Sequence, residues 1–194
     1  MRALAAVLLS ASAACLAAQP GFTLDQLMSL LARRTHGEVK FTETDYLQVL
    51  DQPVKSSGVL VYQAPDHLEK RTLAPRKESM ILQGDELTLQ RGHKTRRFQV
   101  SAYPQAAPYV DAIRDTLAGN EAALAKVFKV GFTGTQAQWR LELVPLDAGA
   151  ARKVKRVEIE GGADVIRSVE ILQADGDRSV MTLAAPTAGS GAGG

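Results

Sequence analysis

Cysteine is almost absent from this chain, since Cys15 is the only one among 194 residues. One cysteine excludes an internal disulfide and any metal site built from several thiolates. Aromatic residues make up only 5% of the sequence, and Trp139 is the single tryptophan, so an aromatic platform for nucleic-acid bases is not expected. The formal net charge of +2 is also too small for electrostatic binding of nucleic acid. The length suits one domain that buries its own core.

Catalytic and metal-binding patterns are lacking as well. The three histidines, His36, His67 and His93, lie far apart in the sequence. They are interpreted as exposed turn residues, and the alternative is that the fold brings all three together as a metal site. No Gly-x-Ser-x-Gly elbow is present, and residues 175–177 lack the further ligands of a calcium loop. We therefore expect no enzyme activity, no metal and no cofactor.

The N-terminus has the layout of a secretory signal peptide. Arg2 precedes a short apolar run, which leads into an alanine-rich stretch, so residues 1–18 are predicted to be removed on export. Cys15 leaves an alternative open: Ala14 before it suits a lipoprotein signal, whereas Ser12 stands where such signals usually have leucine. Both interpretations place the mature protein outside the cytoplasm.

The first mature segment, residues 22–34, is predicted to be an amphipathic helix. Thr23 can cap its start, with Gln26 completing a capping box, and Gly37 is expected to end it. The apolar stripe at helical spacing consists of Leu24, Leu27, Met28 and Leu31.

After Gly37 the hydrophobic period changes from 3.6 to 2, which indicates antiparallel strands with one buried face. The alternating segments are residues 38–42, 86–90, 97–100, 138–143, 156–160 and 168–171. Compact turn signals at residues 83–85, 91–93 and 175–177 separate them. About nine to eleven short strands are predicted.

Helical spacing returns once, at residues 104–119, with Gly119 as a stop. Asn120 is expected to cap a second short helix that runs to about residue 126. Residues 185–194 are small and rich in glycine, so a disordered tail is predicted after a single domain at residues 19–184. One sheet, with its apolar face covered by a few helices, is the expected arrangement.

The order of these features, together with short motifs at residues 41–43, 57–66 and 78–87, resembles the LolA family of periplasmic lipoprotein carriers, and more closely a LolA-like branch of exported proteins. The resemblance extends from residue 22 to residue 183. It implies an α+β, mostly β fold: an incomplete antiparallel barrel of about eleven strands, with the open side covered by about three helices.

The resemblance also implies a function without covalent chemistry. A periplasmic monomer of this kind would bind acyl chains of a lipoprotein or another acylated lipid in an apolar cavity. It would collect this cargo from an inner-membrane exporter and deliver it to an outer-membrane acceptor. One departure is Ala64 before Pro65, where lipoprotein carriers typically have an arginine that holds the helical lid shut. A different acylated cargo is therefore an alternative.

Candidate cavity residues are the apolar members of the predicted strands and helices, each of which could instead serve only to pack the core. They are Val59, Val61, Leu87, Leu89, Phe98, Val100, Trp139, Leu141 and Leu143 from the strands, and Leu27, Leu31, Ile113 and Leu117 from the helices.

The sequence is also compatible with other functions. The same fold could act as a periplasmic sensor or scaffold that binds a protein, and lipidation of Cys15 would make the chain a membrane-anchored acceptor similar in role to LolB. An enzyme acting on acyl groups would need a nucleophile and base that the sequence does not pair. The basic runs at residues 33–34, 96–97 and 153–156 are either solvated faces or docking sites for acidic partners or lipid headgroups.

Overall fold

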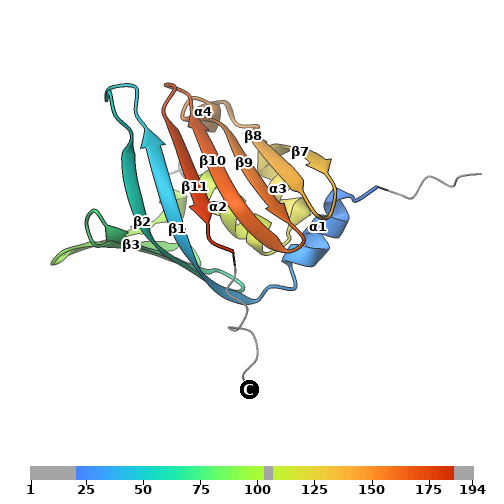
Figure 1. Cartoon of the computed structure of the whole chain (residues 1–194), viewed down its shortest axis with the longest axis horizontal. Helices are drawn as coiled ribbons and strands as arrows, with labels where there is room; N and C mark the ends of the chain where they lie inside the picture. Colours follow the sequence, from blue (N-terminus) through green and yellow to red (C-terminus); the bar gives the residue numbers. More distant parts are fainter. Residues whose placement is uncertain (1–20, 103–106, 186–194) are drawn as a thin grey trace, which may run out of the picture.

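The computed structural model describes residues 21–102 and 107–185. The predicted signal peptide, Cys15 and all of the predicted tail except Ala185 lie outside these described residues, as does the start of the predicted segment at 104–119. The described part is dominated by β-structure (Figure 1).

Eleven strands form one antiparallel sheet in the order β6-β5-β4-β3-β2-β1-β11-β10-β9-β8-β7. Consecutive strands are neighbours except β6 and β7, and at the centre β11 lies between β10 and β1 and joins the two halves. Because β6 and β7 stay at opposite edges, the barrel is incomplete, as expected. The strands are β1 (His36–Tyr46), β2 (Val54–Gln63), β3 (His67–Ala74), β4 (Glu78–Gln83), β5 (Glu86–Arg91), β6 (Lys94–Gln99), β7 (Phe128–Gly134), β8 (Trp139–Pro145), β9 (Val154–Gly162), β10 (Val165–Gln173) and β11 (Arg178–Leu183).

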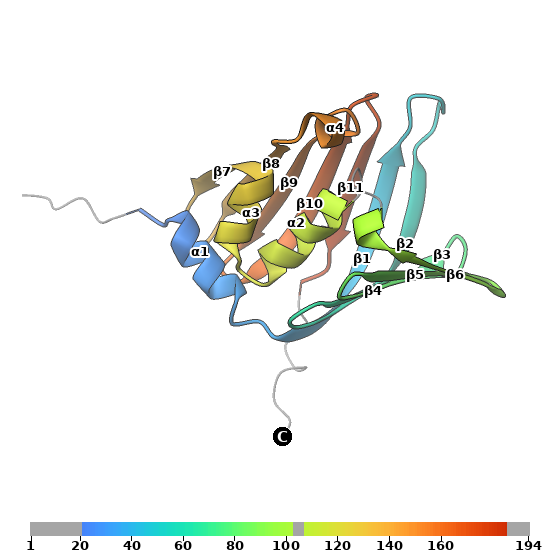
Figure 2. The ribbon, with the colours of Figure 1, turned by 180° about the vertical axis from the view of Figure 1, so that it is seen from behind.

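The helices lie over one half of this sheet. Figure 2 shows α1, α2 and α3 against β7–β10, whereas β3–β6 extend away from them. The expected fold class is confirmed, with four α-helices in the described residues where about three were expected. They are α1 (Leu24–Leu31), α2 (Ala107–Leu117), α3 (Glu121–Val127) and the short α4 (Ala148–Ala151), beside the 3-10 turn η1 (Val100–Ala102).

The local helix signals were mostly correct. Thr23 and Gln26 form the predicted capping box, and the Asn120 side chain caps α3. Gly119 adopts φ +64°, and a Cβ there would lie 2.2 Å from the Met28 carbonyl oxygen, so a glycine allows the α2–α3 turn to approach α1.

The predicted end of the first helix was wrong. The helix ends at Leu31, the last residue of the apolar stripe, and Gly37 lies in β1 opposite Tyr62. Ala32 is exposed, residues 33–36 are polar, and Arg34 pairs with Asp164, so the apolar stripe that buries the helix ends at Leu31.

The main hydrophobic core lies between the helices and β7–β10. Trp139 is 1% exposed and rests on Gly161, where an added Cβ would lie 2.3 Å from the Trp139 ring atom Cζ2. The indole N–H donates to the Ala163 carbonyl oxygen at 3.0 Å, which holds the β9–β10 turn. The buried members of this core are Leu27, Met28, Leu31, Ala112, Leu124, Phe128, Trp139, Leu141, Leu143, Val154, Val157 and Ile159.

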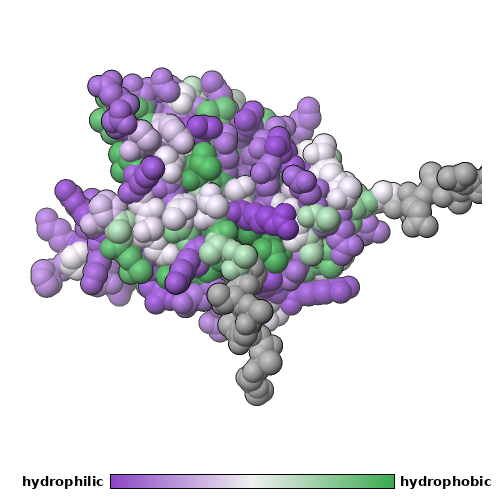
Figure 3. All heavy atoms as spheres, viewed as in Figure 1, coloured by the Kyte–Doolittle hydropathy of each residue, from purple (hydrophilic) through white to green (hydrophobic). Residues whose placement is uncertain are grey.

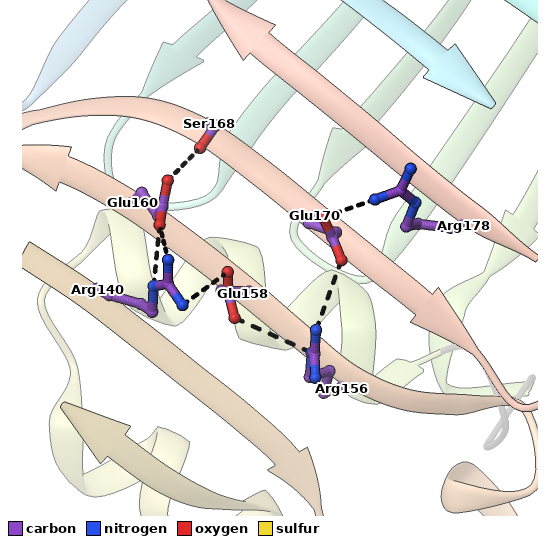
Figure 4. Close-up of polar contacts among 7 residues, drawn as sticks. All are labelled: Arg140, Arg156, Glu158, Glu160, Ser168, Glu170 and Arg178. Carbon is purple, nitrogen blue, oxygen red and sulfur yellow. Dashed lines mark hydrogen bonds and ion pairs between the residues drawn. The ribbon is translucent and has the colours of Figure 1, made fainter. Parts of the chain in front are cut away.

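The face of β8–β11 that points away from the helices carries a ladder of ion pairs (Figure 4). Arg140 bonds Glu160 at 2.6 Å, and Arg156 lies 3.7 Å from Glu170, which also receives Arg178 at 3.6 Å. Figure 3 shows mostly hydrophilic residues on this side, with smaller hydrophobic areas between them. The basic run at residues 153–156 therefore contributes to a solvated face through Arg156.

Candidate functional site

A cavity of about 580 Å³ opens where the helical layer meets the first strands. One wall comes from β1, β2 and β3, and the other from α1, α2, the β9–β10 turn and the end of β11. The volume lies within the usual range for small-molecule sites. Its lining residues are Leu31, Arg34, His36, Gly37, Glu38, Val39, Leu60, Val61, Tyr62, Gln63, Leu68, Leu117, Asp164, Val165, Ile166, Leu183 and Ala184.

The chemistry of this lining is mainly aliphatic. Leucines come from three directions: Leu31 and Leu117 from the helices, Leu60 and Leu68 from the strands, and Leu183 from the end of β11. Such a surface offers few directional bonds, so it suits an apolar ligand that is held by removal from water.

Tyr62 adds a polar group to the wall. Its side chain is largely buried, and burial raises the pKa of its hydroxyl, with the Asp66 carboxylate as a weaker second cause. The hydroxyl therefore stays neutral at physiological pH and leaves the cavity without an added charge at this position.

An ion pair lies at the cavity wall between α1 and the β9–β10 turn. The Arg34 guanidinium donates to Asp164 Oδ2 at 2.8 Å, and this hydrogen bond lowers the pKa of Asp164. The Arg34 Nε atom is buried and has no hydrogen-bond partner among the described residues. Since Trp139 anchors the same turn through Ala163, the pair connects the segment after α1 to a fixed part of the sheet.

The candidate cavity residues selected from the sequence lie in several different parts of the fold. Leu31 and Leu117 line the cavity, and Val61 lies at its wall, although pairing with Glu38 and Glu69 places the Val61 side chain on the outer face of β2. Leu31 also belongs to the main core, together with Leu27, Trp139, Leu141 and Leu143, all of which are 2% exposed or less. Ile113 is half-buried on α2.

The remaining selected residues lie on β2, β5, β6 and η1. Leu87 pairs with Phe98, and Leu89 lies two positions farther along β5. Val100 is buried in η1, immediately after β6. Val59 pairs with Lys40 and Arg71, which places it on the sheet face opposite to Leu60.

Most of the lining residues were not selected from the sequence, and Leu60, Tyr62 and Leu68 are examples on β2 and β3. Leu60 and Tyr62 belong to the same apolar run as Val59 and Val61, where no alternation indicates which residues point inward. Leu68 begins a segment rich in charged residues, and its role depends on pairing with Tyr62 in the neighbouring strand.

In the described ranges, no group of three or more histidine, cysteine or acidic side chains has a metal-binding arrangement. His67 instead contacts Gln83 through Nδ1 at 2.8 Å. Among the helices of residues 21–102 and 107–185, none has the length and apolar composition needed to cross a bilayer.

The fold and the cavity define this protein as an open antiparallel half-barrel with an internal apolar site. The chain belongs to the outer membrane lipoprotein carrier protein LolA-like family, whose model matches residues 16–193. The resemblance inferred from the sequence is thereby confirmed. No curated protein matches the sequence.

Several solved structures are similar to this chain at low sequence identity. A LolA superfamily protein, NE2245 from Nitrosomonas europaea, is 10% identical, with 84% of this chain and 92% of that chain covered and a TM-score of 0.43. A putative outer membrane lipoprotein-sorting protein domain from Vibrio parahaemolyticus is 9% identical, with coverages of 89% and 94% and a TM-score of 0.46. The MucA/MucB complex of Pseudomonas aeruginosa is 11% identical, with 88% of this chain and 61% of that chain covered and a TM-score of 0.43.

Proposed function

We propose that this protein is a periplasmic carrier that shields the acyl chain of a lipoprotein or another acylated lipid during transfer between membranes. The observation that carries the proposal is the aliphatic cavity of about 580 Å³ between β1–β3 and the helices. Family membership supports it, because the matched family is described by lipoprotein carriage. The predicted signal peptide at residues 1–18 supports export.

The physical mechanism is burial of hydrocarbon. Each methylene removed from water contributes about 0.8 kcal/mol, so a sixteen-carbon chain gains roughly 12 kcal/mol before the costs of ordering. Those costs amount to several kcal/mol, and the remainder suffices for useful affinity without specific bonds. Release then requires an acceptor with a more favourable apolar site, because the carrier itself performs no chemical step.

Mass spectrometry of the protein purified from its native envelope without detergent tests this proposal. We expect one acylated molecule per protein in the intact mass, and loss of that mass after organic extraction. An empty protein that also takes up no lipid from membranes would contradict the carrier function. The same spectrum gives the N-terminus: a start near residue 19 indicates a shuttle, whereas an acylated Cys15 indicates an anchored acceptor.

A second candidate is a sensor or scaffold that binds a protein, and an exposed apolar tip favours it. Around the β1–β2 connection Val49 is 88% exposed, Leu50 48%, and Tyr46 and Val54 40% each. Replacing Val49 and Leu50 with serine separates the two functions. A sensor or scaffold would lose its partner, whereas uptake of an acyl ligand by the carrier cavity would persist.

A further inference from the structure

A second cavity, of about 510 Å³, lies on the strands that extend away from the helices. We call strands β2–β6 the N-terminal wing (Figure 2). The cavity is lined by Lys70, Thr72, Glu78, Ser79, Met80, Leu89, Gln90, Arg91, Lys94 and Arg96. It differs from the first cavity because four of its ten lining residues are basic.

Strand register shows which face of the wing carries these side chains. Directly paired residues point to the same face of a sheet. Leu141 of the core pairs with Ile159, and the row continues through Val169 and Met181 to Glu43 in β1. Glu43 therefore lies on the inner face, the face that the helices cover.

The same face continues from β1 across the wing as one row. Alternation places Val39 with Glu43, and Val39 pairs with Leu60. From Leu60 the paired residues are, in order, Lys70, Met80, Leu89 and Arg96. Leu60 lines the apolar cavity and Lys70 lines the basic one, so the two cavities are adjacent on the inner face.

Along the strands this inner face changes from apolar to basic. The row on one side of Leu60 contains only apolar and aromatic side chains: Tyr62, Leu68, Leu82, Leu87 and Phe98. The row on the other side contains Thr72, Glu78, Arg91 and Lys94. From Leu68 to Thr72 is four residues, or roughly 13 Å of extended strand.

The basic side chains are only partly neutralised. Lys70 donates to Glu43, whose carboxylate also accepts from Ser56 and Ser179. Arg91 pairs with Glu78 at 2.7 Å. Lys94 and Arg96 have no acidic partner within the described part of the chain, so two positive charges face this cavity uncompensated.

We infer that the cargo is an anionic amphiphile, with its acyl chain in the apolar cavity and a phosphate or carboxylate headgroup in the basic cavity against Lys94 and Arg96. The inference rests on the proposed carrier function and names the chemical class of its cargo. An arginine guanidinium can bind such a group through two hydrogen bonds, and a lysine ammonium supplies a point charge. Because both side chains are exposed, the headgroup keeps contact with water while the hydrocarbon is buried.

Adjacency of the two cavities favours a lipid over an acidic protein as the occupant. An acidic peptide would need the basic side chains alone, whereas an amphiphile needs an apolar and a basic surface joined on one face. The two cavities join at the Leu60–Lys70 pair, and the same row reaches Arg96 on β6, four strands or roughly 19 Å from Leu60. Arg71 and Arg97, on the opposite face, pair with Glu38 and Glu86 and do not face either cavity.

Lipids with identical acyl chains and different headgroups test the inference. Binding of phosphatidylglycerol, phosphatidylcholine and diacylglycerol to the full purified protein is measured by native mass spectrometry and by displacement of a fluorescent acyl probe. The test variant is K94Q/R96Q. The matched control is R71Q/R97Q, which removes the same charge from the outer face, and circular dichroism checks the folding of both.

We expect the unmodified protein and R71Q/R97Q to bind phosphatidylglycerol about tenfold more tightly than the other two lipids, a preference that weakens with salt. K94Q/R96Q should lose this preference and retain its affinity for diacylglycerol. Equal binding of all three lipids by the unmodified protein would overturn the inference and leave the carrier function intact, whereas failure of every lipid to bind would overturn both. Equal losses in the two variants, or binding of a polyglutamate peptide in place of phosphatidylglycerol, would also overturn it.

Discussion

Replacing Leu68 with glutamine tests the apolar cavity at a position where folding should be largely preserved. Leu68 is half-buried, lines the cavity and lies between Tyr62 and Leu82 in the strand register. A bound acyl chain would complete the burial of this side chain. Loss of that apolar contact removes about 1 kcal/mol, and trapping an unpaired amide under the ligand costs about 1–3 kcal/mol more. The two losses together are about 2–4 kcal/mol, so affinity should fall by roughly thirty- to seven-hundred-fold.

Titration of a fluorescent sixteen-carbon acyl probe, followed by anisotropy, measures this loss. Ile81→Gln is the matched control, because Ile81 is also half-buried but pairs with Glu69 on the outer face of the wing. We expect the control to bind the probe normally and both variants to melt within a few degrees of the unmodified protein. Unchanged binding by a folded Leu68→Gln protein would refute the placement of the acyl chain.

Three further predictions concern the ion pairs and the core. Asp164→Asn should reduce the pH dependence of the free energy of unfolding. Because the pKa of Asp164 is lowered in the folded state, its ionised carboxylate stabilises the fold above the unfolded-state pKa. This stabilisation is lost as pH falls through the folded-state pKa. Denaturant unfolding at neutral and acidic pH checks this, and parallel curves for variant and parent would contradict it. Gly161→Ala should destabilise the protein by at least about 2 kcal/mol, because the added Cβ would lie 2.3 Å from both the Trp139 ring and the Val165 carbonyl oxygen. An unchanged melting temperature would disprove this crowding. Glu43→Gln should cost about 1–3 kcal/mol, since it removes the charge that Lys70 binds, and an unchanged midpoint in the same denaturation assay would contradict this.

Local signals predicted the helix starts and the turns well. The Thr23–Gln26 capping box and the Asn120 cap depend on contacts between residues three positions apart, so the sequence alone indicates them. The end of α1 at Leu31 was missed because it depends on where burial stops, and on the attraction of Arg34 to Asp164, 130 positions away.

Predicting cavity residues from sequence was harder than predicting strands. In the run from Gly58 to Tyr62 both faces are apolar, so the inward residues are decided by pairing of Leu60 with Val39 and Lys70. Leu141 shows the opposite difficulty. Its alternation is clear, but it is fully buried in the main core, so a glutamate there would test folding and not uptake.

Composition and periodicity determined, without any structure, that this chain forms an antiparallel sheet with few helices. These properties depend on spacing along the chain, because strand alternation and helix caps are local. The tertiary structure alone decided that β11 joins the two halves, that the helices cover one half of the sheet, and that an apolar and a basic cavity meet at Leu60 and Lys70. Those features depend on long-range pairing and burial, in which the position of each side chain is set by residues far away in the sequence.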